Sequence, residues 1–525
     1  MTMLVERGVP VPMRDGVNLI ADVYRPADDR APALLQRTPY GADLPPICRP
    51  ANGLRLVDSG YAVVVQDVRG RGRSEGRFDP FVQEAADGED TVAWLRGQAW
   101  WDGGLGMLGS SYSGYLQWSL AERMPKEVRA IAPHVAGPDP AAWFGRNGAH
   151  EWGFGLWWSL AAHAIAEAAR DEDGGRAEDE VWATLNSLDG AYRRGPDDLP
   201  DVIDRIVRYA RGWLQTPQSV PGAVSLEELN VPSLLIGGWH DIFLEQTLAA
   251  FRTHVRAGAP ARLVVGPWSH TVWTGQFPQR DYGRFAAMEA EDITRHHLDW
   301  FDRWIRDEGE EQAPVRFFMM GTDAWEDAAG WPPPGVREDR WRLAWDGAGV
   351  LNSAAGESHL CEVPLDAADP VPTLAGQTLM AGTYAARRAG PWDVGELLDR
   401  TDVICFATEP LQRALEIVGT VRLEVLVAAP HGGDLACALL DLGPDGEAMH
   451  VLDGILRIDA VAHERMVGVT LGTTAIRVEP LHRLVLTVAR SNFPRFDLNE
   501  AGPVVLHLED DRASNLVLPN REPQP

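Results

Sequence analysis

The first third of the chain alternates short apolar runs with segments of helical spacing. Residues 61–67 (YAVVVQD) are almost wholly apolar and β-branched, which is typical of a strand buried on both faces of a sheet. Residues 81–98 instead repeat apolar side chains at helical intervals. Further strands are predicted at residues 19–25, 33–37, 106–108, 128–132, 232–236 and 262–265, and further helices at 112–123 and 241–256. This order predicts an α/β fold with an open, mostly parallel sheet and helices on both faces.

Between residues 138 and 226 the alternation stops and helical spacing replaces it. Helices are predicted at residues 153–169, 179–188 and 199–214, so this part of the chain is interpreted as an α-helical insertion between two strands. The acidic stretch at 171–180 (DEDGGRAEDE) lacks the ligand spacing of an EF-hand. It therefore predicts a solvated connection between helices and no calcium site.

A proline run at residues 331–335 (WPPPG) marks a domain boundary, because proline continues neither helices nor central strands. Beyond it, short apolar runs separated by turn residues predict a β-sandwich or jelly roll. These strands are expected at residues 403–408, 417–427, 435–442, 466–472, 481–488 and 504–507. The predicted domains are the α/β domain in two parts (1–137 and 227–335), the helical insertion (138–226) and the all-β domain (336–525).

Composition narrows the classes of partner and compartment. The 525 residues include 48 Lys and Arg against 76 Asp and Glu, a net charge of −28 that argues against nucleic acid as a partner. No membrane span or secretory signal is expected, because no long apolar run is present and residues 1–14 lack a basic segment followed by an apolar one. Cys48, Cys361, Cys405 and Cys437 are far apart and form no C-x-x-C pair, which fits a reduced cytoplasm.

Residues 106–114 (GMLGSSYSG) carry the strongest chemical signal. A short strand here runs through a glycine-flanked serine directly into a helix, an arrangement that exposes a serine hydroxyl above the edge of a sheet. The spacing departs from the common G-x-S-x-G elbow, because the glycine stands at position 114 and not at 113. Ser111 is the candidate nucleophile, and Ser110 and Ser113 are local rivals.

A nucleophilic serine needs a histidine, and that histidine needs a carboxylate to orient it. Asp241 follows the strand predicted at 232–236, and His270 follows the strand at 262–265. Both thus lie at the carboxyl ends of strands, in the chain order Ser, Asp, His that α/β-hydrolases use. His240 is a weaker candidate for the base, since adjacent residues in a turn rarely point together.

At these residues the sequence resembles the cocaine esterase/X-prolyl dipeptidyl-peptidase family of α/β-hydrolases. The matching stretches span almost the whole chain: residues 37–40 (RTPY), 67–76 (DVRGRGRSEG), 101–102, 109–114, 238–241 (GWHD), 266–270 (GPWSH), 301–304 (FDRW), 319–321 and 491–497 (SNFPRFD). The resemblance implies a G-x-S-Y-x-G elbow, which selects Ser111. It also implies a hydrolase domain with an inserted helical cap and a C-terminal jelly roll.

The resemblance further implies an oxyanion hole made by the hydroxyl of Tyr40 and the backbone N–H of Tyr112, and it places Phe243 at a pocket position. Trp143, Trp152 and Trp157 belong to an aromatic-rich part of the insertion and are candidates for the same pocket. Most aromatic residues there are expected to be core.

Three other charged patterns predict ordinary structure. Glu84, Asp87 and Asp90 are expected to form a solvated acidic face of the helix at 81–98. His296 and His297 are adjacent on a helix and face different directions, so they predict no metal site. The glycines at 70–76 do not have the spacing of a dinucleotide-binding loop.

The sequence therefore predicts a serine hydrolase that cleaves carboxylic esters of small apolar or aromatic substrates through an acyl-enzyme. No metal or organic cofactor is expected, and the all-β domain offers surface for a homodimer. The alternatives are an X-prolyl dipeptidyl-peptidase or α-amino-acid ester hydrolase on the same triad and, more remotely, an inactive binding protein.

Overall fold

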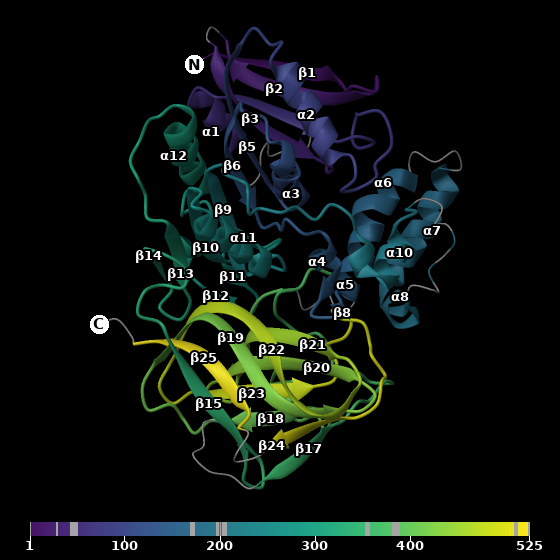
Figure 1. Ribbon diagram of the computed structural model, residues 1–525, viewed down its shortest axis with the longest axis vertical. Helices are drawn as coiled ribbons and strands as arrows, with labels where there is room; N and C mark the ends of the chain where they lie inside the picture. The colour runs from purple at the N-terminus through teal and green to yellow at the C-terminus, as the bar shows by residue number, and fades with distance from the viewer. Residues whose placement is uncertain are drawn as a thin grey trace.

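A computed structural model describes residues 2–27, 30–42, 51–168, 174–195, 199, 201, 207–351, 358–380, 389–508 and 513–522. Three parts are distinguishable in Figure 1: an α/β domain at the N-terminal end, a group of helices beside it, and an all-β domain that contains the C-terminal strands. The α/β class, the helical insertion and the C-terminal all-β domain predicted from the sequence are all confirmed. The residue boundaries proposed between them stay predictions.

The α/β domain is built on one mixed sheet, ten-stranded in the described part of the chain, in the order β1-β2-β4-β3-β5-β6-β9-β10-β13-β14. Its strands are β1 (Met3–Pro12), β2 (Asn18–Pro26), β3 (Ala31–Thr38), β4 (Ala62–Asp67), β5 (Trp101–Ser110), β6 (Val128–His134), β9 (Ser233–His240), β10 (Ala261–Ser269), β13 (Val315–Met319) and β14 (Ala324–Ala328). The strands from β4 through β13 in this order are parallel, while β1, β2 and β14 pair antiparallel at the margins. The carboxyl ends of β5, β9 and β10 therefore meet at the same edge of the sheet.

Helices cover both faces of this sheet. The apolar sides of α2 (Glu84–Leu95), α3 (Tyr112–Trp118) and α11 (Leu244–Ala257) pack on one face, and those of α1 (Gly53–Asp58) and α12 (Ile293–Ile305) pack on the other. Strand β4 is buried along its whole length between these two layers, as its apolar sequence predicts. A small hairpin, β11 (Gln276–Phe277) with β12 (Arg280–Asp281), follows β10.

The cap is the helical segment between β6 and β9. It contains α4 (Ala141–Phe144), β7 (Gly145–Arg146), β8 (Ala149–His150), α5 (Trp152–Trp157), a π-helical segment (Trp158–Ala164), α6 (Ile165–Ala168), α7 (Gly174–Asn186), α8 (Leu188–Arg194) and α10 (Ala210–Gln215). Of the helix predicted at 199–214, residues 210–214 belong to α10, and residues 200 and 202–206 lie outside the described residues. Residues 171–173 of the acidic stretch also lie outside them.

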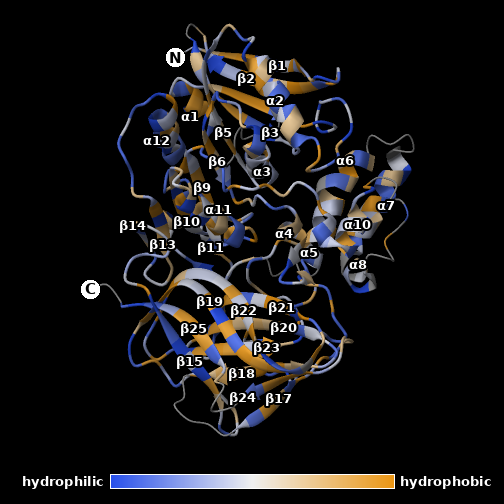
Figure 2. Cartoon of the chain, viewed as in Figure 1, coloured by the Kyte–Doolittle hydropathy of each residue, from blue (hydrophilic) through white to orange (hydrophobic). Residues whose placement is uncertain are grey.

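The all-β domain has two layers that share β15 and enclose an apolar core of their own. Its strands are β15 (Arg337–Trp345), β16 (Gly349–Leu351), β17 (His359–Val363), β18 (Ile404–Ala407), β19 (Leu415–Ala429), β20 (Gly433–Leu442), β21 (Ala448–Ile458), β22 (Val461–Val478), β23 (Arg483–Ala489), β24 (Val504–Leu508) and β25 (Asn515–Arg521). Figure 2 shows hydrophobic and hydrophilic residues mixed along these strands, as expected for strands with one face on the core. No helix among the described residues is long and apolar enough to cross a bilayer.

Candidate active site

Ser111 stands at the sharp turn between β5 and α3, in a strained backbone conformation with φ 58° and ψ −126°. The turn depends on two glycines. A Cβ on Gly109 would lie 2.6 Å from the Cβ of Ser113, and a Cβ on Gly114 would lie 2.6 Å from the Cβ of Ala136. Strand and helix therefore approach each other only because both positions lack side chains.

The structure brings the three predicted catalytic side chains together. The Nε2 atom of His270 lies 3.1 Å from Ser111 Oγ, and its Nδ1 atom lies 2.7 Å from Asp241 Oδ2. Asp241 is completely buried, and its other carboxylate oxygen accepts the backbone N–H of Phe243 at 2.7 Å. The arrangement matches a nucleophile, a base and an orienting acid in hydrogen-bonding order.

Two of the rivals named from the sequence, Ser113 and His240, are buried. Ser113 is buried within α3, against the strand-to-helix turn. His240 is also buried, and its Nε2 lies 3.2 Å from the hydroxyl of Tyr282. Desolvation lowers the pKa of His240 to about 3, so this imidazole stays neutral at physiological pH.

Two donors converge beside the serine. The hydroxyl oxygen of Tyr40 lies 3.5 Å from Ser111 Oγ, and 40% of the surface of the whole residue is exposed. Desolvation raises the pKa of Tyr40. Ser111, Trp158 and the backbone of Tyr112 have the opposite, smaller effect and lower it. The phenol is thus protonated at neutral pH and can donate a hydrogen bond beside Ser111. The backbone of Tyr112 affects the same hydroxyl group of Tyr40.

Comparison with known proteins places the chain in a family. Residues 15–272 match the family model described as X-Pro dipeptidyl-peptidase (S15 family), and residues 308–520 match that of the X-Pro dipeptidyl-peptidase C-terminal non-catalytic domain. The sequence is also 35% identical to a cocaine esterase of Rhodococcus sp., over 98% of both chains. The chain belongs to the cocaine esterase/X-prolyl dipeptidyl-peptidase family of α/β-hydrolases. It is therefore a serine hydrolase.

Solved structures of other hydrolases share the fold over 99% of the chain. An aminopeptidase from a Thaumarchaeota archaeon superposes with a TM-score of 0.74 at 20% identity, and the match covers 96% of the aminopeptidase chain. An α-amino acid ester hydrolase superposes with a TM-score of 0.71 at 20% identity, and the match covers 97% of the hydrolase chain. These likenesses show that the chain shares its overall fold with solved hydrolases.

The side chain of Tyr112 has a different environment from its backbone. Its hydroxyl donates to the carboxylate of Glu84 at 2.7 Å and accepts the N–H of Phe81 at 2.8 Å, entirely within the protein. The Arg37 guanidinium, from the R-T-P-Y stretch of the family, pairs with the same carboxylate at 3.3 Å. Burial raises the pKa of Glu84, opposed by the charge of Arg37 and the hydroxyl of Tyr112.

The solvated acidic face predicted for α2 is therefore wrong for two of its three members. Glu84 and Asp87 are 3% and 2% exposed, and Asp87 pairs with Arg69 at 2.6 Å. Only Asp90 lies near the surface, where it binds Arg14. The sequence missed this because the arginine partners come from β3 and the loop after β4, which are distant from α2 in the sequence.

The aromatic candidates fall into two separate clusters. Phe243 packs edge-on against the His270 ring with centroids 5.3 Å apart, and Trp143 packs against Phe243 at 4.8 Å. Trp152 lies instead in the core of the cap, where its indole N–H donates to the carbonyl of Tyr192. Trp157 is partly buried and borders both clusters.

Sequence reasoning did not select Phe81 or Trp158, which stack at 5.9 Å beside Tyr112. Trp158 also lowers the pKa of the Tyr40 hydroxyl, against the larger effect of desolvation. The aromatic run that ends at Trp158 was visible in the sequence. Its direction was not, because a π-helical segment begins there and shifts the side chains away from the 3.6-residue spacing. Among the described residues, no three His, Cys, Asp or Glu side chains are grouped closely enough to hold a metal ion.

Proposed function

We propose that the chain is a carboxylic-ester hydrolase in which Ser111, His270 and Asp241 form the catalytic triad. The observation that carries this proposal is the unbroken line from Ser111 Oγ to His270 Nε2 at 3.1 Å and from His270 Nδ1 to Asp241 Oδ2 at 2.7 Å. Tyr40, 3.5 Å from the same serine oxygen, adds a donor where negative charge would develop.

In the acylation step, Ser111 Oγ attacks the ester carbonyl carbon while His270 Nε2 accepts the serine proton. The tetrahedral oxyanion accepts hydrogen bonds from the Tyr40 hydroxyl and the Tyr112 N–H. Collapse of this intermediate breaks the bond to the alkoxy oxygen, which leaves as the alcohol after taking the proton from His270. A water molecule, deprotonated by His270, then attacks the acyl-enzyme carbonyl carbon. Collapse of this second intermediate breaks the bond to Ser111 Oγ, which takes the proton back from His270, and the acid is released.

The substrate class we propose is a small ester with an apolar or aromatic acyl group. Phe243 packs on the His270 ring and Trp143 packs on Phe243, and burial of an apolar acyl group against aromatic side chains beside the base would be favourable. The similarity to a cocaine esterase supports the same class. The family match also gives X-Pro dipeptidyl-peptidase as the second candidate.

The test compares an aryl ester with an X-Pro anilide on the full-length protein. We expect a higher kcat/KM for the ester, and a preference for the anilide would replace the first candidate with the second. Ser111→Ala should lower ester turnover by about 10⁴-fold or more, whereas Ser110→Ala should retain it. Loss of turnover in Ser110→Ala alone would contradict the assignment of the nucleophile.

The location and assembly of the protein remain part of the proposal. The free thiols of Cys361, Cys405 and Cys437 support a reducing compartment such as the cytoplasm. The expected homodimer and the expected absence of a nucleic-acid partner stay predictions, the latter supported by the net charge of −28.

A further inference from the structure

A chain of buried charges leads from the all-β domain into the cap. Arg495 lies in the 491–497 stretch that the sequence shares with its family, and its side chain is 0% exposed. Its guanidinium lies 2.5 Å from Asp453 of β21 and 3.4 Å from Glu151, just before α5 of the cap. Glu151 in turn pairs with Arg146 of β7 at 3.2 Å. The four charges alternate in sign, so each one stabilises its neighbours.

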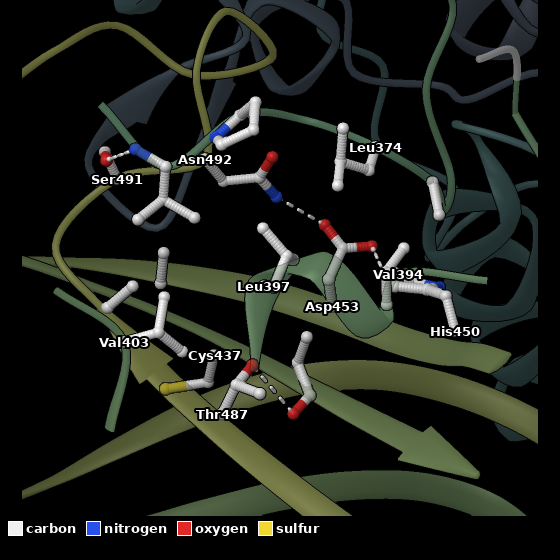
Figure 3. A pocket seen from close by; sticks show the side chains of 16 residues that line it. Leu374, Val394, Leu397, Val403, Cys437, His450, Asp453, Thr487, Ser491 and Asn492 are labelled. Carbon is white, nitrogen blue, oxygen red and sulfur yellow. Dashed lines mark hydrogen bonds and ion pairs between the residues drawn. The ribbon is translucent and has the colours of Figure 1, made fainter. Parts of the chain in front are cut away.

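At the end of this series of charges in the all-β domain, the Asp453 carboxylate is fixed by several contacts. Figure 3 shows Asp453 between Asn492 and His450, with the Asn492 amide donating to Oδ2 at 2.9 Å and His450 Nε2 lying 3.4 Å from Oδ1. Burial opposes ionisation of Asp453, but Arg495 and His450 prevail and hold its pKa below the ordinary value. The carboxylate is thus a permanent counter-ion that fixes Arg495.

The other end of this series of charges is Arg146, which contacts the loop that carries Asp241. Arg146 donates from Nη2 to the carbonyl oxygen of Ile242 at 3.1 Å. This carbonyl and the N–H of Phe243 belong to one peptide unit, and that N–H donates to Asp241 Oδ1 at 2.7 Å. Because a peptide unit is planar, holding its oxygen also fixes the direction of its N–H. Polarisation along such a hydrogen-bonded chain also strengthens the bond to the carboxylate.

Two more hydrogen bonds from the all-β domain stabilise the residues on either side of Asp241. The amide of Gln377 donates to the carbonyl of Trp239 at 3.0 Å, and the hydroxyl of Thr473 donates to Glu245 at 3.1 Å. Trp239 precedes Asp241 and Glu245 follows it in α11. The loop that carries the acid is therefore held from both sides.

We propose that Arg146 is a positioning residue for Asp241, and that the all-β domain holds Arg146 in place through Arg495 and Glu151. This inference rests on the proposed function, since it assumes that Asp241 orients His270. It gives the domain whose family model is described as non-catalytic an indirect part in the geometry of the proposed triad.

A purely structural role is the competing explanation, and Arg457 provides the matched control. Arg457 of β21 pairs with Asp434 and Asp497, which both belong to the all-β domain, at 2.8 and 2.9 Å. The backbone N–H of His150 in β8 donates to the same Asp497. Arg457 therefore resembles Arg146 in chemistry and burial but makes no contact with residues 241–243 that the structure describes.

The experiment measures kcat and KM for an aryl ester, the rate of serine labelling by a fluorophosphonate, and thermal unfolding, all on the full chain. Arg146→Met should lower kcat and the labelling rate by roughly 10- to 100-fold with KM changed less than about twofold, as a misplaced catalytic group does. Arg457→Met should lower the unfolding temperature while it leaves kcat within about twofold of the parent. In Arg146→Ala, millimolar guanidinium should restore part of the lost rate, which a general packing defect does not allow.

Glu151→Gln tests the longer path without leaving an isolated charge at Arg495, which keeps Asp453. Its loss of kcat should be non-additive with that of Arg146→Met, because both substitutions act on the same peptide unit. Unchanged kcat in Arg146→Met, while Asp241→Asn lowers kcat by about 10⁴-fold, would overturn the inference and leave the proposed function standing. Equal losses of kcat in Arg146→Met and Arg457→Met would also overturn it. If Asp241→Asn kept full activity, the proposed function itself would fail.

Discussion

At the scale of single residues, the two tyrosines beside Ser111 differ in the group that we propose each contributes to the oxyanion hole, the hydroxyl of Tyr40 and the backbone N–H of Tyr112. Tyr40 presents its hydroxyl to the serine and is 40% exposed, whereas the hydroxyl of Tyr112 is buried against Glu84. The sequence predicted the positions of Ser111, Asp241 and His270 because motif order and strand ends are local features. It did not predict the Glu84 anchor, because that contact joins α2 to α3 through tertiary packing alone.

Tyr40→Phe removes the hydroxyl that we assign to the oxyanion hole. We expect kcat to fall by about 10²- to 10³-fold with little change in the unfolding temperature, because a donor aimed at a developing negative charge acts mainly on the transition state. Steady-state kinetics on an aryl ester provide the measurement. Tyr61→Phe is the control, since its hydroxyl donates to Asp302 of α12 at 2.8 Å. A similar loss of kcat in that variant would contradict the assignment.

Tyr112→Phe should have the opposite result. The backbone N–H stays in place, but Glu84 loses its 2.7 Å donor and the Phe81 N–H loses its acceptor. Leaving buried polar groups unpaired costs about 1–3 kcal/mol of unfolding free energy, while kcat should fall by less than about tenfold. Urea unfolding and kinetics on the same preparation test this, and a variant with full stability but kcat as low as that of Tyr40→Phe would refute it.

At the scale of elements, the sequence predicted strands and helices best where the hydrophobic period is strong and both faces are buried. Strand β4 is the clearest case. Strands β1 and β15 were not predicted, because β1 is exposed along most of its length and β15 carries charged side chains at one end. Their pairing partners, β2 and β25, supply the order that the local pattern lacks. The helix predicted at 153–169 is present as α5, the π-helical segment and α6, but the wider π-helical turn inside it was not predicted from the sequence.

Gly114→Ala tests the element that presents the nucleophile. The new Cβ would lie 2.6 Å from Ala136 Cβ and 3.1 Å from the His134 carbonyl oxygen, so α3 must move away from β6 and carry Ser111 with it. We expect a loss of about 10²-fold or more in kcat and about 1–3 kcal/mol of unfolding free energy. Gly212→Ala in α10 is the control: a Cβ there has nothing within 4 Å, and the exchange should stabilise the helix by about 0.5–1 kcal/mol. An active, fully stable Gly114→Ala variant would show that the turn tolerates a side chain.

At the scale of the whole molecule, parts of the chain far apart in sequence meet at the proposed triad. The α/β domain supplies Ser111, Asp241 and His270, the cap supplies Arg146, and the all-β domain holds the cap through Arg495. Arg521 near the C-terminus makes a similar link, pairing with Glu416 of its own domain and Glu326 of β14, both at 2.7 Å. The sequence predicted the α/β domain, the helical insertion and the all-β domain in their order, but it did not predict these long-range ion pairs. The spacing of charges along the sequence does not indicate which residue, hundreds of positions away, is the partner.

Buried histidines make the stability of the whole fold sensitive to acid. His297 of α12 is completely buried beside His134 of β6, with ring centroids 5.6 Å apart, and desolvation lowers the pKa of His297 to about 4 from an ordinary 6.5. Between these values the unfolded chain binds a proton at this residue and the folded chain does not. Stability therefore falls as the pH drops below 6.5, by up to about 1.4 kcal/mol per pH unit, and this contribution levels off near pH 4.

His297→Leu should flatten the pH dependence of the unfolding free energy across this window, whatever it does to stability at neutral pH. Denaturant unfolding at several pH values measures the slope, with His359→Leu in the all-β domain as a partly exposed control. An unchanged slope in His297→Leu would mean that His297 is not the source of this acid sensitivity.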